Sequence, residues 1–146
     1  MATPQDADLI IKLYDLRREE TMRKARNYFV VEFFPKSADD VKALFTNFEE
    51  HPEHNAYFRQ VVSYWDMVAA MVNHGSIDRE LFFDTNGEFF GVWAKIGDFI
   101  EDLRAFFGPQ FLASLEKLIA SHPDGARRVQ MIKERFNTIL AQRARK

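Results

Sequence analysis

The glycines and prolines of this chain mark the ends of helices, and their scarcity elsewhere is the strongest constraint on its fold. The 146 residues include only six glycines and five prolines. Thr3-Pro4 is typical of a helix start, and Pro35 predicts the end of that helix. Gly75 and Gly108-Pro109 predict the C-terminal ends of two later helices. Because signals for β-strands are weak between these positions, we expect an all-α fold.

Apolar residues recur at helical spacing through most of the chain and predict six or seven helices. A chain of this length is typical of a single domain that buries roughly 70% of its unfolded surface. We therefore expect one helical domain over residues 1–146. It comprises a long N-terminal helix at about 4–34, a bundle core at about 37–140 and a frayed basic tail at 141–146.

The middle of the predicted N-terminal helix is almost wholly charged. The stretch RREETMRKAR runs from Arg17 to Arg26, between apolar stripes on either side. A helix that is polar all round is usually solvated and stabilised by pairs of Glu and Arg. We expect this helix to protrude partly from the bundle.

The composition excludes several classes of function. The chain has no cysteine, which excludes disulfides, thiol nucleophiles and thiolate metal sites and favours a cytoplasmic protein. Its formal net charge of -2 does not require nucleic acid or an anionic membrane as a partner. No apolar run reaches the ~18 residues of a membrane span, and no signal peptide is predicted. Since phosphate-binding loops and nucleophile motifs are also missing, we expect no catalytic residue, no enzyme and no cofactor.

His51-Pro52-Glu53-His54 is the one cluster of histidines in the sequence. A zinc or iron site needs three or four ligands, and a pair of histidine ligands on a helix is spaced by four residues rather than three. We therefore interpret the stretch as a polar loop in which Pro52 begins the next helix, and we expect no metal site.

The last twenty residues are strongly basic, with Glu134 as their one acid. The possible contacts for an anion such as nucleic acid or phospholipid are Arg127, Arg128, Lys133, Arg135, Arg143, Arg145 and Lys146. A solvated helix face is the alternative, because cations are favoured near a helix C-terminus. No aromatic residue lies in the terminal QRARK, which disfavours nucleic acid.

Asp66 is an acid within the apolar stretch VVSYWDMVAAMV. At about 100° per residue, it lies on a helix face with Val62, Ala69 and Ala70, away from the stripe that contains Trp65. This face of small and polar residues is either solvated or close to another helix.

Arg104 is the more unusual charge, because on one continuous helix at 88–107 it falls on the stripe of Trp93, Ile100 and Phe107. A guanidinium cannot lose its charge, so it needs a carboxylate, backbone oxygens or water. We expect Asp66 and Arg104 to form an ion pair, directly or through a water. The alternatives are that Asp66 is solvent-exposed, or that Arg104 binds an anionic ligand in an aromatic pocket with Tyr64, Trp65 and Trp93.

The same residues carry a family resemblance. Tyr64-Trp65-Asp66, Gly75, Ile77-Asp78-x-Glu80-Leu81, Trp93 and Arg104 follow the pattern of a bacterial helical family known only as a domain of unknown function. The similar region spans about residues 58–107. The resemblance implies a helical fold and no activity. Members of that family often begin with a membrane-spanning helix, which is not predicted here.

Three functions remain open. The leading hypothesis is a non-catalytic interaction or regulatory domain with an unknown protein partner, or a homodimer formed through the N-terminal helix. The second is an anion or nucleic-acid binder that uses the basic C-terminal helix. The third is a small-molecule site in the aromatic pocket around Arg104.

Overall fold

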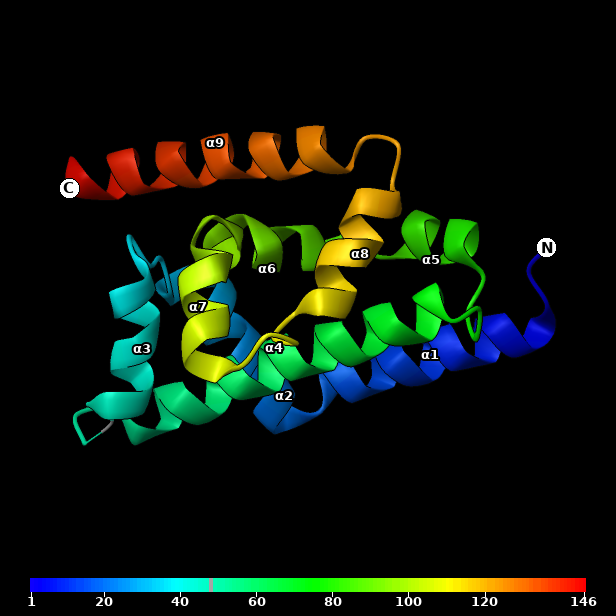
Figure 1. Ribbon diagram of the computed structural model, residues 1–146, viewed down its shortest axis with the longest axis horizontal. Helices are drawn as coiled ribbons and strands as arrows, with labels where there is room; N and C mark the ends of the chain where they lie inside the picture. The colour runs from blue at the N-terminus through cyan, green and yellow to red at the C-terminus, as the bar shows by residue number, and fades with distance from the viewer. Residues whose placement is uncertain (48) are drawn as a thin grey trace.

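The computed structural model is helical throughout (Figure 1), and it describes residues 1–47 and 49–146. Its elements are α1 (Pro4–Arg18), α2 (Glu20–Asn27), the π-helix η1 (Tyr28–Glu32), α3 (Ala38–Thr46), α4 (Pro52–Asn73), α5 (Arg79–Thr85), α6 (Glu88–Ile96), the 3-10 helix η2 (Gly97–Phe99), α7 (Ile100–Phe107), α8 (Ala113–Ser121) and α9 (Gly125–Ala144). No strand occurs in the described part of the chain. The prediction of an all-α bundle is confirmed.

The long helix α4 lies at the centre of the packing. It packs against α2 on one side and α8 on another, while α6 packs against α9. In Figure 1, α1, α2 and α4 form one side of the molecule and α9 covers the opposite side. The two termini lie at opposite ends.

Large aromatic side chains fill the centre, and many of the phenylalanines that are frequent in the sequence are buried there. The largest fully buried side chains include Trp65, Phe29, Phe58, Phe82, Phe89 and Phe90. Their rings meet in tilted and edge-to-face pairs, such as Phe82 and Phe89 at 5.4 Å between centroids. Burying aromatic rings in this way contributes more than the same apolar area without ring contacts.

The prediction of one continuous helix at 4–34 is wrong, because the chain breaks at Glu19. This residue has an extended ψ of 144°, and its carboxylate accepts hydrogen bonds from the amides of Thr21 and Met22. Glu19 is therefore the N-cap of a second helix, α2. The hydrogen-bonding pattern changes again at η1, where the Phe33 amide donates to the Tyr28 carbonyl, five residues back.

The charged segment does not protrude. Met22 and Ala25 are buried in the core, and the side chains of Arg17 and Arg26 are only 14% and 28% exposed. Both guanidinium groups turn toward Glu88, the first residue of α6. No local pattern predicts this partner, because Glu88 lies 62 residues beyond Arg26.

The predicted helix at 88–107 is also interrupted, by the 3-10 turn Gly97–Phe99. A Cβ atom at Gly97 would lie 2.7 Å from the Trp93 ring, so this position requires a glycine. The interruption changes the helical register, and Leu103 rather than Arg104 becomes the fully buried residue of α7. The placement of Arg104 on the apolar stripe was therefore wrong.

Lys95 is a buried cation that the sequence pattern did not reveal, and it is only 7% exposed. Its ammonium donates to the carbonyls of Phe29, Val30 and Phe33 at 2.5, 2.9 and 2.7 Å. These carbonyls lie at the end of η1, where a helix leaves its last oxygens without amide partners. Burial, with a smaller contribution from Arg143, lowers the pKa of Lys95 to about 7. The three carbonyls favour the charged form and oppose that shift.

We predict that Lys95→Met destabilises the protein by roughly 2 kcal/mol at neutral pH, because buried carbonyls lose their donors. Between about pH 7 and the ordinary lysine range, the unfolded wild type binds more protons than the native protein, whose Lys95 pKa is about 7. Wild-type stability therefore rises with pH across this window, and the deficit of the variant grows. Urea unfolding measures both effects, with the exposed Lys117→Met as the matched control. If Lys95→Met and Lys117→Met were equally stable, the stabilising role of the Lys95 ammonium would be contradicted.

Candidate functional site

The consecutive residues Tyr64, Trp65 and Asp66 of α4 contact different parts of the molecule. The Tyr64 hydroxyl donates to the Leu13 carbonyl of α1 at 2.7 Å. Burial raises the pKa of Tyr64 to about 12, so it stays a neutral donor at physiological pH. This bond fastens the middle of α1 to α4.

Trp65 belongs to a polar cluster around Glu88. Its indole Nε1 donates to Glu88 Oε1 at 3.4 Å, and Arg26 Nη2 lies 2.6 Å from Glu88 Oε2. Arg17 Nη1 lies 3.8 Å from the same oxygen, with its guanidinium over the Trp65 ring. A carboxylate in the first turn of α6 also interacts favourably with the helix dipole. The cluster thus joins α1, α2, α4 and α6.

Asp66 caps a neighbouring helix. Its Oδ1 accepts the Leu115 amide of α8 at 2.9 Å. The residue that precedes α8, Leu112, has a left-handed φ of 55° and offers no capping side chain. Asp66 therefore supplies from α4 the N-terminal acceptor that α8 lacks. Burial raises the pKa of Asp66, against the opposing effect of its backbone hydrogen bonds and of the Arg104 charge.

The predicted direct ion pair between Asp66 and Arg104 is wrong. Arg104 Nη2 pairs with Glu116 Oε1 at 3.0 Å, and its Nε donates to the Phe111 carbonyl at 3.0 Å. Both Asp66 and Arg104 therefore stabilise the start of α8, each through its own partner. The Arg104 charge still favours ionised Asp66 at a distance.

The four residues of the predicted aromatic pocket do not gather in one place. Tyr64 and Trp65 face α1 and α6, and Arg104 lies at α8, while Trp93 lies against Gly97. Asp66 instead lines a pocket of about 420 Å³ whose aromatic walls are Phe45, Phe58, Phe107 and Phe111.

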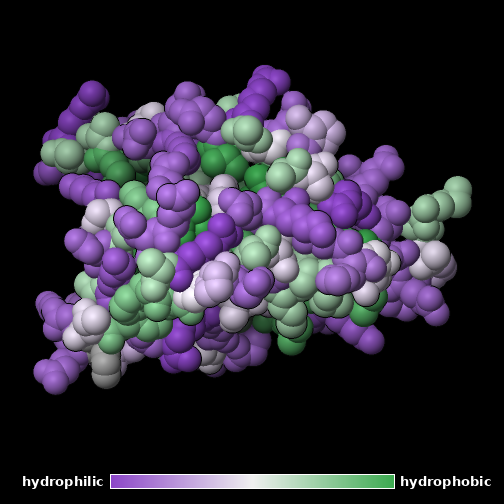
Figure 2. Space-filling view, in the orientation of Figure 1, coloured by the Kyte–Doolittle hydropathy of each residue, from purple (hydrophilic) through white to green (hydrophobic). Residues whose placement is uncertain are grey.

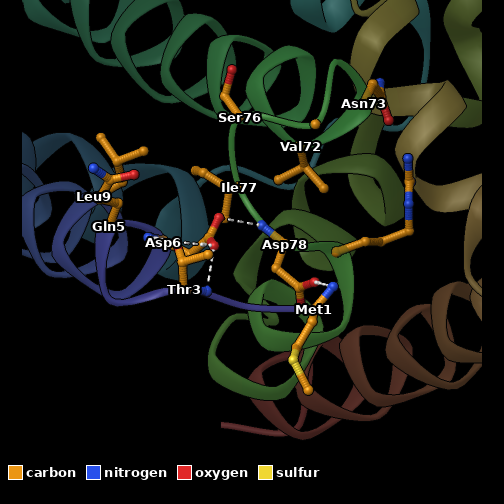
Figure 3. Close-up of a pocket in the computed structure, with 12 residues that line it drawn as sticks. Met1, Thr3, Gln5, Asp6, Leu9, Val72, Asn73, Ser76, Ile77 and Asp78 are labelled. Carbon is orange, nitrogen blue, oxygen red and sulfur yellow. Dashed lines mark hydrogen bonds and ion pairs between the residues drawn. The ribbon is translucent and has the colours of Figure 1, made fainter.

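A second pocket, of about 540 Å³, lies between the start of α1 and the α4–α5 connection (Figure 3). Asp6 is buried there and accepts the Thr3 amide and hydroxyl, both at 2.7 Å. Its other oxygen accepts the Asp78 amide at 2.9 Å. The hydrogen bonds from Thr3 lower the pKa of Asp6, so this carboxylate is an ionised anchor for the end of α1.

Three of the seven basic residues near the C-terminus are engaged within the protein. Lys133 pairs with Asp98 at 2.7 Å, and Arg143 donates to the Val31 carbonyl at 2.8 Å. Arg128 lies over the Phe90 ring. The exposed members of the set are Arg127, Arg128, Arg135, Arg143, Arg145 and Lys146. Since α9 continues to Ala144, the predicted tail at 141–146 is largely helical.

The outer face of α1 carries exposed apolar side chains. Ile11 is 58% and Tyr14 50% exposed, one helical turn apart. On the adjacent helix α4, Met67 is 47% exposed. Figure 2 shows hydrophobic side chains in green among the polar ones along the edge that α1 and α4 form.

The family model described as "Domain of unknown function (DUF4760)" matches residues 2–121. The chain belongs to this family. Searches of curated proteins and of solved structures gave no significant match. The resemblance seen in the sequence is thereby confirmed, and it extends from α1 to the end of α8.

Several residues on which the sequence resemblance rests have structural roles. Ile77 is buried, and Asp78 caps α5 by accepting the Leu81 amide at 2.9 Å. Gly75 has a φ of 83°, which suits glycine at the end of α4. Helix α9 lies outside the matched region. Among the described helices, none combines the length and the apolar character needed to cross a membrane.

We predict that Asp66→Asn preserves the cap of α8, because an amide oxygen accepts the same hydrogen bond. Asp66→Ala removes the acceptor and should cost about 1 kcal/mol. Since burial raises the pKa of Asp66, the native state binds a proton more tightly than the unfolded state does. The unfolding free energy of the wild type should therefore fall as pH rises above the ordinary carboxyl range, relative to Asp66→Asn.

Urea unfolding of the three proteins from pH 4 to 8 tests this account. If Asp66→Asn lost as much stability as Asp66→Ala at neutral pH, the charge would matter more than the cap. The account of Asp66 as a helix cap would then be wrong.

Proposed function

We propose that the protein is a non-catalytic interaction domain that forms a homodimer through the outer face of α1. The observation that carries this proposal is the exposure of Ile11 and Tyr14 on a helix whose opposite face is already packed on the bundle. Large apolar side chains grouped on one outer face are typical of protein interfaces.

The spacing of the exposed residues suits a second copy of the same helix. Ala7, Ile11, Tyr14 and Arg18 lie within about 60° of one another on a helical wheel. If two copies of α1 cross antiparallel midway between Ile11 and Tyr14, Ile11 of each copy lies opposite Tyr14 of the other. Such a two-fold contact is self-complementary and closes after two subunits.

Arg18 in the stripe and Asp8 beside it fit the same arrangement. In the antiparallel pair, Arg18 of one copy lies near Asp8 of the other, and the two-fold axis repeats this contact. Asp8 and Arg18 are both exposed, and the Arg18 guanidinium lies over the Tyr14 ring at 5.5 Å. In a parallel pair, Asp8 would lie beside Asp8 of the other copy and Arg18 beside Arg18, so like charges would meet.

The proposed dimer uses a different part of the N-terminal helix from the charged segment that was expected to protrude. The charged segment at 17–26 is packed on the bundle, so the contact surface moves to the first half of the predicted N-terminal helix. The cysteine-free composition is the support for a cytoplasmic location of this domain.

A small-molecule site is the second candidate function. The phenylalanine-lined pocket beside Asp66 favours it, because a cavity with apolar walls and few polar groups is typical of ligand sites. The anion-binding hypothesis has weaker support, since Lys133 is paired with Asp98 and Arg143 with a backbone carbonyl.

We predict that the wild type forms a concentration-dependent dimer and that Ile11→Ser/Tyr14→Ser is monomeric at the same concentrations. Light scattering after size exclusion measures both. Leu16→Ser is the matched control, because Leu16 is 54% exposed on the same helix but lies about 140° from Ile11 on the wheel. A wild type that stays monomeric at high concentration, or equal weakening by the control, would contradict the proposal.

Charge reversal provides a second test of the same interface. Asp8→Arg and Arg18→Asp should each weaken the dimer several-fold, because they place like charges together. The double variant should restore much of the affinity. If the double variant dimerised no more tightly than the single variants, the antiparallel arrangement would be excluded.

A further inference from the structure

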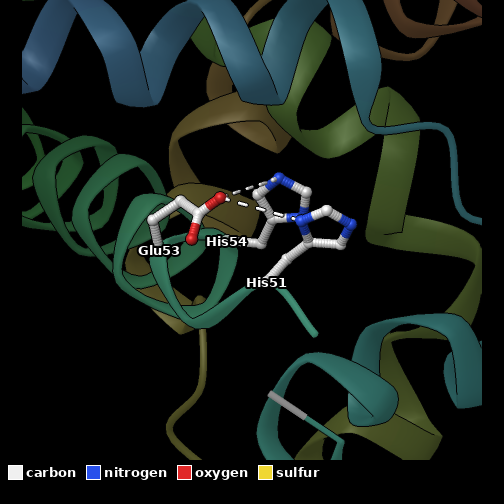
Figure 4. Close-up of side chains that lie close together, drawn as sticks. All are labelled: His51, Glu53 and His54. Carbon is white, nitrogen blue, oxygen red and sulfur yellow. Dashed lines mark ion pairs between the residues drawn. The ribbon is translucent and has the colours of Figure 1, made fainter. Parts of the chain in front are cut away.

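Two histidines and a glutamate meet at the start of α4 (Figure 4). His51 precedes the helix, Pro52 is its first residue as the sequence predicts, and Glu53 and His54 belong to its first turn. The three donor atoms, one nitrogen from each imidazole and one carboxylate oxygen, all lie within 4.8 Å of one another. Glu53 adds a third donor to the histidine pair noted in the sequence.

The distances are close to those of a metal site. His51 Nδ1 lies 3.7 Å and His54 Nε2 3.9 Å from the same oxygen, Glu53 Oε1. Both separations are too long for hydrogen bonds. Ligands of a tetrahedral zinc ion lie about 3.4 Å apart, given bonds of about 2.0–2.1 Å. Small side-chain movements would bring each nitrogen to this separation from the oxygen.

One imidazole has to turn for both nitrogens to face the same ion. The His51 and His54 rings are stacked, with centroids 4.5 Å apart and an angle of 15° between their planes. His54 is held on its other side by the Tyr28 ring at 4.2 Å. The His51 side chain is 57% exposed and makes no capping hydrogen bond, so His51 is the ring that can turn.

The surrounding charge is compatible with a cation. Glu49 and Glu50 immediately precede the cluster and are exposed, so three carboxylates lie within six residues of the chain. Their charge offsets the positive end of the α4 dipole, which would otherwise disfavour a cation at this position. His51 and Glu53 are exposed, so water or another molecule can occupy the remaining coordination positions.

We propose that His51, Glu53 and His54 bind one divalent transition-metal ion. Two imidazoles and one carboxylate are a ligand set suited to Zn²⁺, Ni²⁺ or Co²⁺, whereas Mg²⁺ and Ca²⁺ prefer oxygen ligands. With three protein ligands, the ion keeps at least one open position.

Calorimetric titration of the untagged chain with ZnCl₂ tests this site. We expect saturable binding of one ion per chain and no comparable binding of MgCl₂. His51→Ala, Glu53→Gln and His54→Ala should each weaken zinc binding by roughly tenfold or more, since even changes behind metal ligands cost that much. Because His51 is exposed, its variant should keep the melting temperature of the wild type.

His74→Ala is the matched control, since His74 is an exposed histidine at the other end of α4. It should bind zinc as the wild type does. The site would be overturned by a wild type that shows no saturable zinc binding, or by a His51→Ala variant that binds zinc as tightly as the wild type. The site would also be overturned if His74→Ala weakened zinc binding as much as His51→Ala does.

Discussion

Two charged side chains on one face of α6 hold the N-terminal segment on the bundle. Glu88 and Lys95 are seven residues apart, two helical turns along the same face. Glu88 pairs with Arg26 and Arg17, and the Lys95 ammonium donates to the carbonyls at the end of η1. The acid lies in the first turn of α6 and the base in its last turn, so both also match the dipole of that helix.

The position of the first helix follows from this attachment. The chain turns at Glu19, and α1 then lies antiparallel to α4, with Leu13 bound to Tyr64 and Asp6 bound to the Asp78 amide. One face of α1 is thereby buried, as Leu13 shows. The opposite face, with Ile11 and Tyr14, is directed outward and is the surface on which the proposed homodimer depends.

Local signals in the sequence were sufficient for the fold class and for most helix ends. Pro4, Pro52 and Gly75 lie where a helix starts or stops, because the conformational restrictions of proline and the freedom of glycine act within a few residues. The break at Glu19 was missed because a glutamate that caps a helix is also a good helix former.

The partners of the charged residues could not be predicted, because a helical wheel does not represent contacts between separate helices. Arg104 was assigned to Asp66, but the turn at Gly97–Phe99 changed its register and Glu116 of α8 became its partner. Lys95 is buried because the end of η1, 62 residues earlier in the chain, covers it. The proximity of Glu53 to both histidines was accessible from sequence, since the three residues lie within one turn of the chain.

Spin-label distances across the proposed dimer test the central claim most directly. The chain has no cysteine, so single labels can be placed at Gln5→Cys or Lys12→Cys, two exposed positions outside the contact stripe. In an antiparallel pair that crosses midway between Ile11 and Tyr14, the Gln5 labels should lie roughly 15 Å further apart than the Lys12 labels, given the rise of a helix and the usual spacing of packed helices. Equal distances at the two positions, or no dipolar coupling at Lys12, would contradict the account.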